Sequence, residues 1–179
     1  MACDFITTGR LEPCKDSVGG INAIYFVPYG DIGRSDINTL TGVIDSVTAD
    51  TPAYKFDVRG NSSYTENIQS SRENGTTAFE QVLELTFKKL TKEDQKVIKL
   101  LSYNRPHILI EDNNGNIFAS GLEYGSDVTG GTVVTGAAMA DMSGYTLTFT
   151  GMEKEPATFL DATNSTDLEG IGFSVTDGV

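Results

Sequence analysis

The stretch from Thr77 to Leu90 constrains the fold of this chain more than any other part of its sequence. Apolar and polar side chains alternate along it with a period of two, which predicts one long strand with a buried face and a solvent face. Gln81 on the apolar face and Val82 on the polar face are the two exceptions. The chain must therefore build a sheet that packs on one side. The apolar positions are Phe79, Leu83, Leu85 and Phe87, and the polar positions are Glu80, Glu84, Thr86 and Lys88.

Shorter strands are predicted on both sides of this stretch, because β-branched and aromatic residues cluster between glycine- and asparagine-rich turns. The chain has 19 glycines and only 5 prolines, which suits many short strands joined by tight turns. Asn114-Gly115 and Ser143-Gly144 mark two hairpin turns. A β-rich fold follows. The predicted strands are 21–29, 42–47, 53–58, 106–111, 117–122, 132–142, 145–151 and, weakly, 172–176.

One helix is predicted, over residues 92–103. Thr91 is a suitable N-cap, and acidic residues follow it in the first turn, where the helix dipole favours them. The residues Val97, Leu100 and Leu101 are spaced i, i+3, i+4, so we expect this face of the helix to pack on the sheet.

The element order favours a mainly β fold, either a β-sandwich or a partly closed barrel, with one packed α-helix. We expect residues 1–20 to form an N-terminal arm, 21–160 a β-rich core and 161–179 a C-terminal tail. Within the core, residues 48–77 are the candidate for a loop or hairpin that contacts another subunit. The segment 60–77 is so polar that two interpretations stay open: a mobile loop, or two polar strands whose partners belong to another subunit.

The net charge is −12 and the calculated isoelectric point is about 4.3. Up to Leu122 there are 16 acidic and 12 basic residues, whereas from Glu123 onward there are nine acidic residues and one basic residue, Lys154. A field of this sign repels phosphate, which argues against tight binding to a nucleic-acid backbone. Solubility alone is the simpler explanation of the same charge.

No constellation of side chains in the sequence predicts catalysis, a metal site or a cofactor site. The only histidine, His107, lies in a predicted strand and is expected to be structural or at the surface. The segment 112–116 is similar to the start of an EF-hand loop, but its final glutamate would be Glu123, with a strand in between. The glycine-rich run 121–136 lacks the following helix of a dinucleotide fingerprint, and GxSxG and phosphate-loop motifs are absent. The sequence therefore does not predict an enzyme.

The sequence gives no sign of a membrane segment. No apolar run approaches the roughly 18 residues that a membrane helix needs, and residues 1–10 lack the basic and apolar parts of a secretory signal. We therefore expect the protein to be made and kept in a cytoplasm, without a membrane partner. Cys3 and Cys14 are then expected to be free thiols.

The second half of the chain has a recognisable order of features. A Gly130-Gly131 turn is followed by a small-residue stretch from Gly136 to Met142 (GAAMADM), and then by SGYTLTFTG running into EKEPA. In these features the segment 78–160 resembles virion structural proteins of tailed bacteriophages, especially of phages that infect Bacteroidota. The order of strand, capped helix, strand and two hairpins is also similar to tail tube subunits and to related type VI secretion tube proteins.

The resemblance implies a β-sandwich or barrel with one flanking helix that assembles into hexameric rings, which stack around a DNA-conducting channel. In that family long strands line the channel, and loops or terminal arms reach the next ring; residues 48–77 are the candidate for its long stacking hairpin. The resemblance further implies homo-oligomers, other tail or connector proteins as partners, passage of DNA without tight binding, and a place in the virion tail after assembly in the host cytoplasm. A tail terminator, a connector or a tail ring protein stays open as an alternative.

A DNA channel is expected to carry acidic residues, because a basic wall would hold the phosphate backbone. On this hypothesis the lumen-facing acids lie on polar strand faces or their turns: Glu80, Glu84, Asp127 and Asp141.

Two other function classes compete with this hypothesis. One is a phage decoration domain or a carbohydrate-binding β-module, and the other is a small enzyme. The β-module would bind through exposed aromatic side chains, with four candidates: Tyr25, Tyr29, Tyr64 and Tyr124.

Overall fold

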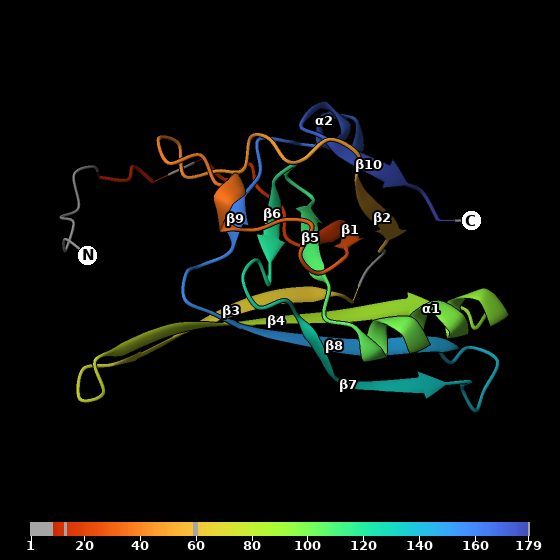
Figure 1. The fold of residues 1–179 in the computed structure, drawn as a ribbon. Helices are drawn as coiled ribbons and strands as arrows, with labels where there is room; N and C mark the ends of the chain where they lie inside the picture. The colour runs from red at the N-terminus through yellow and green to blue at the C-terminus, as the bar shows by residue number, and fades with distance from the viewer. Residues whose placement is uncertain (1–8, 13, 59–60, 179) are drawn as a thin grey trace.

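A computed structural model describes residues 9–12, 14–58 and 61–178, which form two β-sheets, two α-helices and one short 3-10 helix. Strands make up 44% and helices 13% of the structure. Figure 1 shows the two sheets as two layers, one above the other. The predicted fold class, a mainly β sandwich-like fold with a packed helix, is confirmed.

The first sheet has six strands in the order β10-β2-β1-β5-β6-β9. Its centre is buried on both faces, so that the five residues from Ala23 to Val27 are all 3% exposed or less. This explains why the sequence shows an apolar run here instead of an alternation. The strands are β1 (Ile21–Val27), β2 (Thr51–Asp57), β5 (His107–Asp112), β6 (Ile117–Ser120), β9 (Thr158–Phe159) and β10 (Phe173–Thr176).

The second sheet has four strands, all antiparallel, in the order β3-β4-β8-β7. Its inner face supplies Leu83, Leu85 and Phe149 to a core shared with Ile108 and Ile110 of the first sheet. The alternation predicted for residues 77–90 is confirmed by strand β4. The strands are β3 (Ser63–Ser71), β4 (Thr76–Lys88), β7 (Asp127–Val134) and β8 (Gly144–Glu153).

The two exceptions in that alternation have different outcomes. Gln81 is 2% exposed, and its side-chain oxygen accepts hydrogen bonds from Ser120 Oγ (3.0 Å) and from the Gly121 amide (2.8 Å). It therefore holds the end of β6 against the second sheet. Val82 lies on the solvent face, where its paired neighbours are threonines.

Helix α1 (Lys92–Tyr103) has the predicted bounds, and Thr91 Oγ1 accepts a hydrogen bond from the Asp94 amide at 3.0 Å, as an N-cap does. The predicted packing face is partly wrong, because Leu100 is 53% exposed. Ile98 takes its place beside Leu101 in the core of the second sheet. The helix lies along the end of that sheet, so residues spaced i, i+3 from Ile98 face inward and Leu100 is turned to the flank.

One predicted strand is absent from the described residues, and another is displaced along the chain. Residues 42–47 form no strand, and Ile44 makes only isolated bridges to Ile37 and Leu160. Residues 136–142 form a loop, because strand β7 already begins at Asp127 and ends at Val134. The hairpin between β7 and β8 therefore has a longer connection than the Ser143-Gly144 turn predicts.

The expected C-terminal tail is instead part of the core. Helix α2 (Ser165–Gly170) buries Leu168 completely, and β10 pairs in parallel with β2 and buries Phe173. Apolar residues are so sparse in this segment that only one or two per element mark it as packed.

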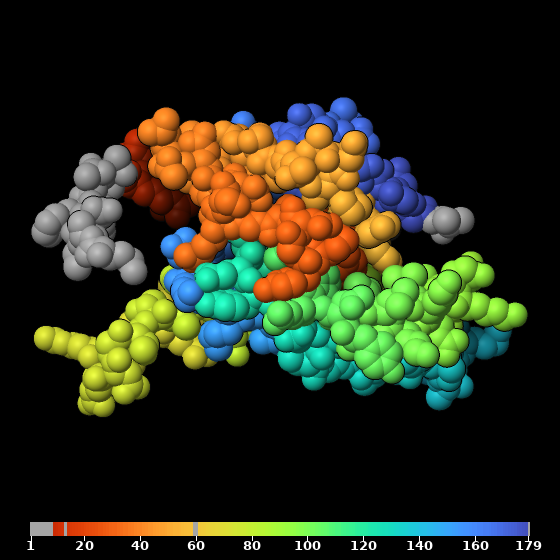
Figure 2. All heavy atoms as spheres, viewed as in Figure 1, coloured from red at the N-terminus to blue at the C-terminus, as the bar shows by residue number. Residues whose placement is uncertain are grey.

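The polar segment 60–77 also finds its partner within the chain. Strand β3 pairs with β4 from Ser63 opposite Glu84 to Ser71 opposite Thr76. The far end of this hairpin passes beyond β8, whose last pair joins Glu153 to Phe79, and it projects from the body at the end away from α1 (Figures 1 and 2).

Of the expected N-terminal arm, residues 9–12 and 14–20 are described, and they are exposed coil. Val18 is tied to the turn after β5, because its amide donates to Asn114 Oδ1 at 2.8 Å. Cys14 is an exposed free thiol, whereas Cys3 lies outside the described residues.

Candidate functional site

The solvent face of the second sheet is rich in threonine. The ladder registers place Thr65 and Thr150 beside Val82, and Thr146 and Thr132 beside Thr86. These side chains alternate with the buried ones, so they all point away from the core. We call this surface the threonine face, and it comprises Thr65, Thr86, Thr129, Thr132, Thr146, Thr148 and Thr150 together with the charged residues described below.

Hydroxyl groups on the threonine face bind one another across strands. Thr132 Oγ1 lies 2.6 Å from Thr146 Oγ1, and Thr129 Oγ1 lies 2.9 Å from Thr150 Oγ1. Cross-strand threonine pairs stabilise a sheet, and β-branched residues suit its pleat. The result is a polar surface on which four threonine hydroxyls already have a side-chain partner.

Three of the four acids expected to face a lumen share this surface. Glu80 and Glu84 are on β4, and Asp127 is on β7 opposite Thr150. Gln69 Nε2 donates to Glu80 Oε2 at 3.1 Å, and the exposed Lys88 lies at the end of the same strand. Within the described part of the chain, the face therefore has three carboxylates and one ammonium group.

The fourth acid, Asp141, is not on the threonine face. It lies in the loop between β7 and β8, where its carboxylate accepts hydrogen bonds from the amides of Ala138 (2.7 Å) and Ala137 (2.8 Å). These two backbone donors lower the pKa of Asp141 below its ordinary value. The residue holds the loop together, as aspartate commonly does in turns.

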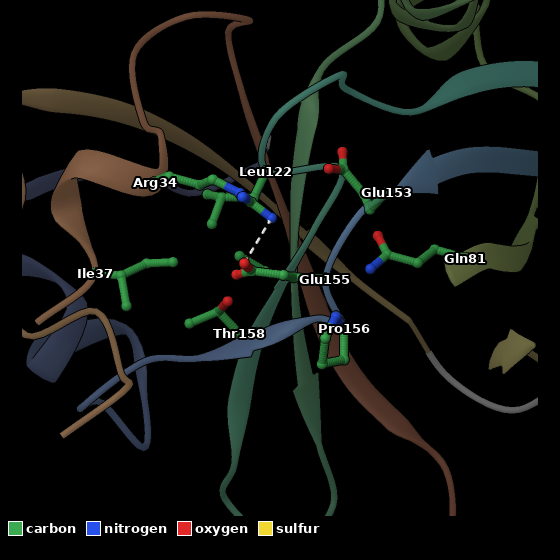
Figure 3. Close-up of a pocket in the computed structure, with 9 residues that line it drawn as sticks. Arg34, Ile37, Gln81, Leu122, Glu153, Glu155, Pro156 and Thr158 are labelled. Carbon is green, nitrogen blue, oxygen red and sulfur yellow. Dashed lines mark ion pairs between the residues drawn. The ribbon is translucent and has the colours of Figure 1, made fainter. Parts of the chain in front are cut away.

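A partly buried polar junction lies on the other side of the second sheet, between β8 and the 3-10 helix η1 (Arg34–Asp36). Arg34 bridges Glu123 (3.3 Å) and Glu155 (3.2 Å), and Figure 3 shows its side chain directed at Glu155. Glu153 is 4% exposed and accepts hydrogen bonds from the Glu123 and Tyr124 amides.

Burial raises the pKa of Glu153 above its ordinary value, although the two amide donors act in the opposite direction. The cavity at this junction has a volume of about 10 Å³, close to what one water molecule needs. This is a structural junction and has no room for a substrate.

The sequence predicts that His107 is either a structural residue or a surface residue. It is buried, in a structural position. Its Nε2 accepts a hydrogen bond from the Gly30 amide at 2.9 Å, so its Nδ1 carries the proton and donates to the Gly121 carbonyl at 2.6 Å. The ring also stacks on Tyr29, with centroids 5.1 Å apart. Burial lowers the pKa of His107 below its ordinary value. The imidazole joins two loops of the first sheet.

The tyrosines considered for a β-module are mostly engaged. Tyr25 is fully buried and donates to Glu111 Oε2 at 2.6 Å, so its predicted exposure is wrong. Tyr64 packs against the core. Tyr29 and Tyr124 are 45% and 43% exposed, with Arg105 over one ring and Lys154 over the other. Each of the two exposed rings thus has a cation over it, and the other two tyrosines are not free at the surface.

An open groove, which no sequence pattern predicted, lies beside α1 between the two sheets. It has a volume of about 980 Å³, and its apolar lining comes from both layers and from the helix. Charged residues, Glu93, Asp94 and Asp177 among them, stand at its rim. The apolar lining residues are Phe56, Phe87, Val97, Ile98 and Leu101.

Within the described part of the chain, no group of three or more histidine, cysteine, aspartate or glutamate side chains is placed to hold a metal ion. No helix among those residues is long and apolar enough to span a membrane. Comparisons with protein-family models, with curated proteins and with solved structures gave no match to this chain.

Proposed function

We propose that this protein is a structural protein of a tailed-bacteriophage virion, a tail tube subunit that forms rings stacked around a DNA-conducting channel. One observation carries the proposal: the solvent face of a four-stranded sheet combines threonine hydroxyls with Glu80, Glu84 and Asp127. The resemblance of residues 78–160 to phage structural proteins supports it independently. We assign the threonine face to the channel wall.

The chemistry of the threonine face suits a wall that DNA passes without being held. Lysine and arginine supply most of the attraction that proteins have for phosphate, through release of counterions. Among its described residues, this face has a single lysine, Lys88, and three carboxylates that repel phosphate. Its hydroxyls are weak competitors for phosphate, because several are hydrogen-bonded to each other.

The size of the sheet suits a ring. Six copies of a four-stranded sheet would form a barrel of about 24 strands. At a strand spacing of ~4.7 Å and the usual tilt, such a barrel is about 45 Å across between backbones. Side chains narrow this opening, yet it remains wide enough for duplex DNA. The role of a tail terminator, connector or tail ring protein rests on the same ring and is the alternative.

The proposal is tested by reversing charge on the threonine face and observing both assembly and DNA binding. We expect the purified protein to form rings or tubes in negative-stain images. The double variant Glu80→Lys/Glu84→Lys should still assemble, because both side chains point away from the core. Its tubes should retain DNA in a salt-dependent way, whereas wild-type tubes should not.

A matched control reverses two exposed acids elsewhere, Asp161→Lys/Glu169→Lys, and leaves the threonine face intact. This control changes the net charge by the same amount and should not retain DNA. A stable monomer in the images would contradict the ring. Equal DNA retention by both double variants would contradict the assignment of the threonine face to the channel.

A further inference from the structure

We infer that β7 of one copy pairs antiparallel with β3 of the next copy, in a register that places Val133 opposite Tyr64 and Val128 opposite Ile68. This inference rests on the proposed ring and names the surface that closes it. We call the junction the β3–β7 seam.

Both strands of the seam are free edges. The second sheet ends at β3 on one side and at β7 on the other, and no further strand among the described residues pairs with either. Neither edge contains a lysine, an arginine or a proline, the residues that commonly prevent edge pairing. The one charge of β3, Glu66, is already bound by the Ala157 amide.

The strand directions fit a ring of identical copies. All neighbours in the sheet are antiparallel, so β3 and β7 run in opposite directions. When copies are related by rotation about one axis, β7 of one copy meets β3 of the next in antiparallel fashion. The sheet can therefore continue from copy to copy without a change in its pattern.

The core of the second sheet is incomplete at these two edges. Inward residues of the central strands are buried, for example Leu83 and Phe149, each 1% exposed. At the edges Ile68 is 69% and Val133 is 64% exposed, although both are on the inward side of their strands. Helix α1, which lies against β7, leaves Leu100 and Tyr103 exposed as well. A second copy of the chain is the occupant that would cover both edges at once.

The register follows from the ladders. Gly130 of β7 pairs with Thr148, Thr148 pairs with Glu84, and Glu84 pairs with Ser63, the first residue of β3. The two edge strands therefore overlap only at their ends and are offset along the strand direction. To overlap, the next copy must shift along the strands. A shift of about four residues at ~3.3 Å each, across four strands ~4.7 Å apart, tilts the strands by about 35°, within the range of closed barrels.

This shift of about four residues also matches the side chains. On the inner side it places Tyr64 opposite Val133 and Ile68 opposite Val128, while Glu66 faces Gly131, which has no side chain. On the outer side Thr65 meets Thr132 and Gln69 meets Asp127, so the threonine face continues across the seam without opposing like charges. Shifts of two or six residues would place Glu66 opposite Val128 or Val133.

Disulfide trapping tests the register. In a chain with Cys3 and Cys14 changed to serine, the double variant Tyr64→Cys/Val133→Cys should form intermolecular disulfides on mild oxidation, because directly opposite residues have the Cβ separation that a disulfide needs. Denaturing gels should show a ladder of covalent oligomers with loss of the monomer band. The double variant Ile68→Cys/Val128→Cys tests the same register at a second position. It keeps the test possible if the first variant does not fold.

The matched control is Tyr64→Cys/Thr132→Cys, which moves one thiol to the opposite face of the sheet and should leave the monomer band unchanged. Rings in negative-stain images without disulfides in either pair would overturn the seam and leave the proposed ring standing. Disulfides in the single variants Tyr64→Cys or Val133→Cys alone would overturn it in favour of like-to-like pairing. Monomers without any cross-link would overturn both the seam and the ring.

Discussion

The two sheets of this protein differ in how completely each is buried by its own chain. In the first sheet, β1 and β5 are buried on both faces, and α2 covers the side away from the second sheet. In the second sheet one face lies in solvent, and the apolar residues at its two edges are exposed. The first sheet is thus a self-sufficient core, whereas the second is a surface suited to contacts with other copies. The four predictions below test this contrast.

The largest effect is expected in the first sheet. Leu109 of β5 is fully buried between β1 and β6, so Leu109→Ala should lower the free energy of unfolding by about 2–5 kcal/mol. Thr148→Val on the threonine face keeps the branched shape and should change it by less than about 0.5 kcal/mol. Chemical denaturation of the dilute monomer measures both. Similar losses in the two variants would contradict the contrast.

The next effect concerns the contact between the sheets. Gln81→Leu keeps the size of the side chain but removes the acceptor for Ser120 Oγ and for the Gly121 amide, both buried. Leaving them without a partner should cost about 1–3 kcal/mol. Val82→Leu, one position along and on the solvent face, is the control and should cost much less. An unchanged denaturation midpoint for Gln81→Leu would show that these hydrogen bonds do not hold β6.

Sequence reasoning succeeded where one residue property repeats along one element. The alternation in β4 shows in the sequence because one of its faces is buried, and the bounds of α1 show because Thr91 and the first-turn acids mark its start. Alternation also placed Glu80 and Glu84 together. Their nearness to Asp127 depends on the register of β7 against β8, which no local pattern encodes.

The sequence failed where burial depends on partners far away in the chain. The sequence predicts a tail over residues 161–179 because its apolar residues are few and form no long pattern. Leu168 and Phe173 are nevertheless buried by residues of distant strands. The sequence predicts Asp141 on a polar strand face or in a turn, because a strand is predicted over residues 132–142. Strand β7 instead ends at Val134, and Asp141 closes the loop that follows. Likewise, the sequence predicts a loop or an inter-subunit strand where β3 lies, because this segment is polar on both faces.

A pH effect should appear in the first sheet, at the loops joined by His107. Its pKa is lowered by burial, so the folded state prefers the neutral ring and the unfolded state binds a proton more readily. The stabilisation is complete above the ordinary pKa of about 6.5 and is lost as the pH falls below it. The hydrogen bond to the Gly121 carbonyl and the charge of Asp31 act in the opposite direction. Tyr29 stacks on the imidazole, and Arg105 lies over the Tyr29 ring.

The measurement for His107 is the thermal midpoint between pH 8 and pH 5. We expect the midpoint of the wild-type protein to fall over this interval more than that of His107→Gln, which has no titratable side chain at position 107. The variant should also be less stable than the wild type at pH 8, because it cannot reproduce both hydrogen bonds. Parallel pH profiles for the two proteins would show that the imidazole stays neutral throughout, or that its protonation is harmless.

The smallest effect is expected at Leu100, and it sharpens the contrast most. The sequence predicts a core residue there, for which Leu100→Ala would cost about 2–5 kcal/mol. The side chain is 53% exposed, and alanine is the best helix former, so the monomer should lose less than about 0.5 kcal/mol. Leu101 packs on the second sheet, so Leu101→Ala should lower the stability of the monomer clearly more.

If Leu100 borders the β3–β7 seam, Leu100→Ala should instead weaken assembly. The protein concentration at which rings form should then rise, while the unfolding midpoint of the monomer stays unchanged. A large loss of monomer stability in Leu100→Ala would show that Leu100 packs in the core and not at the seam.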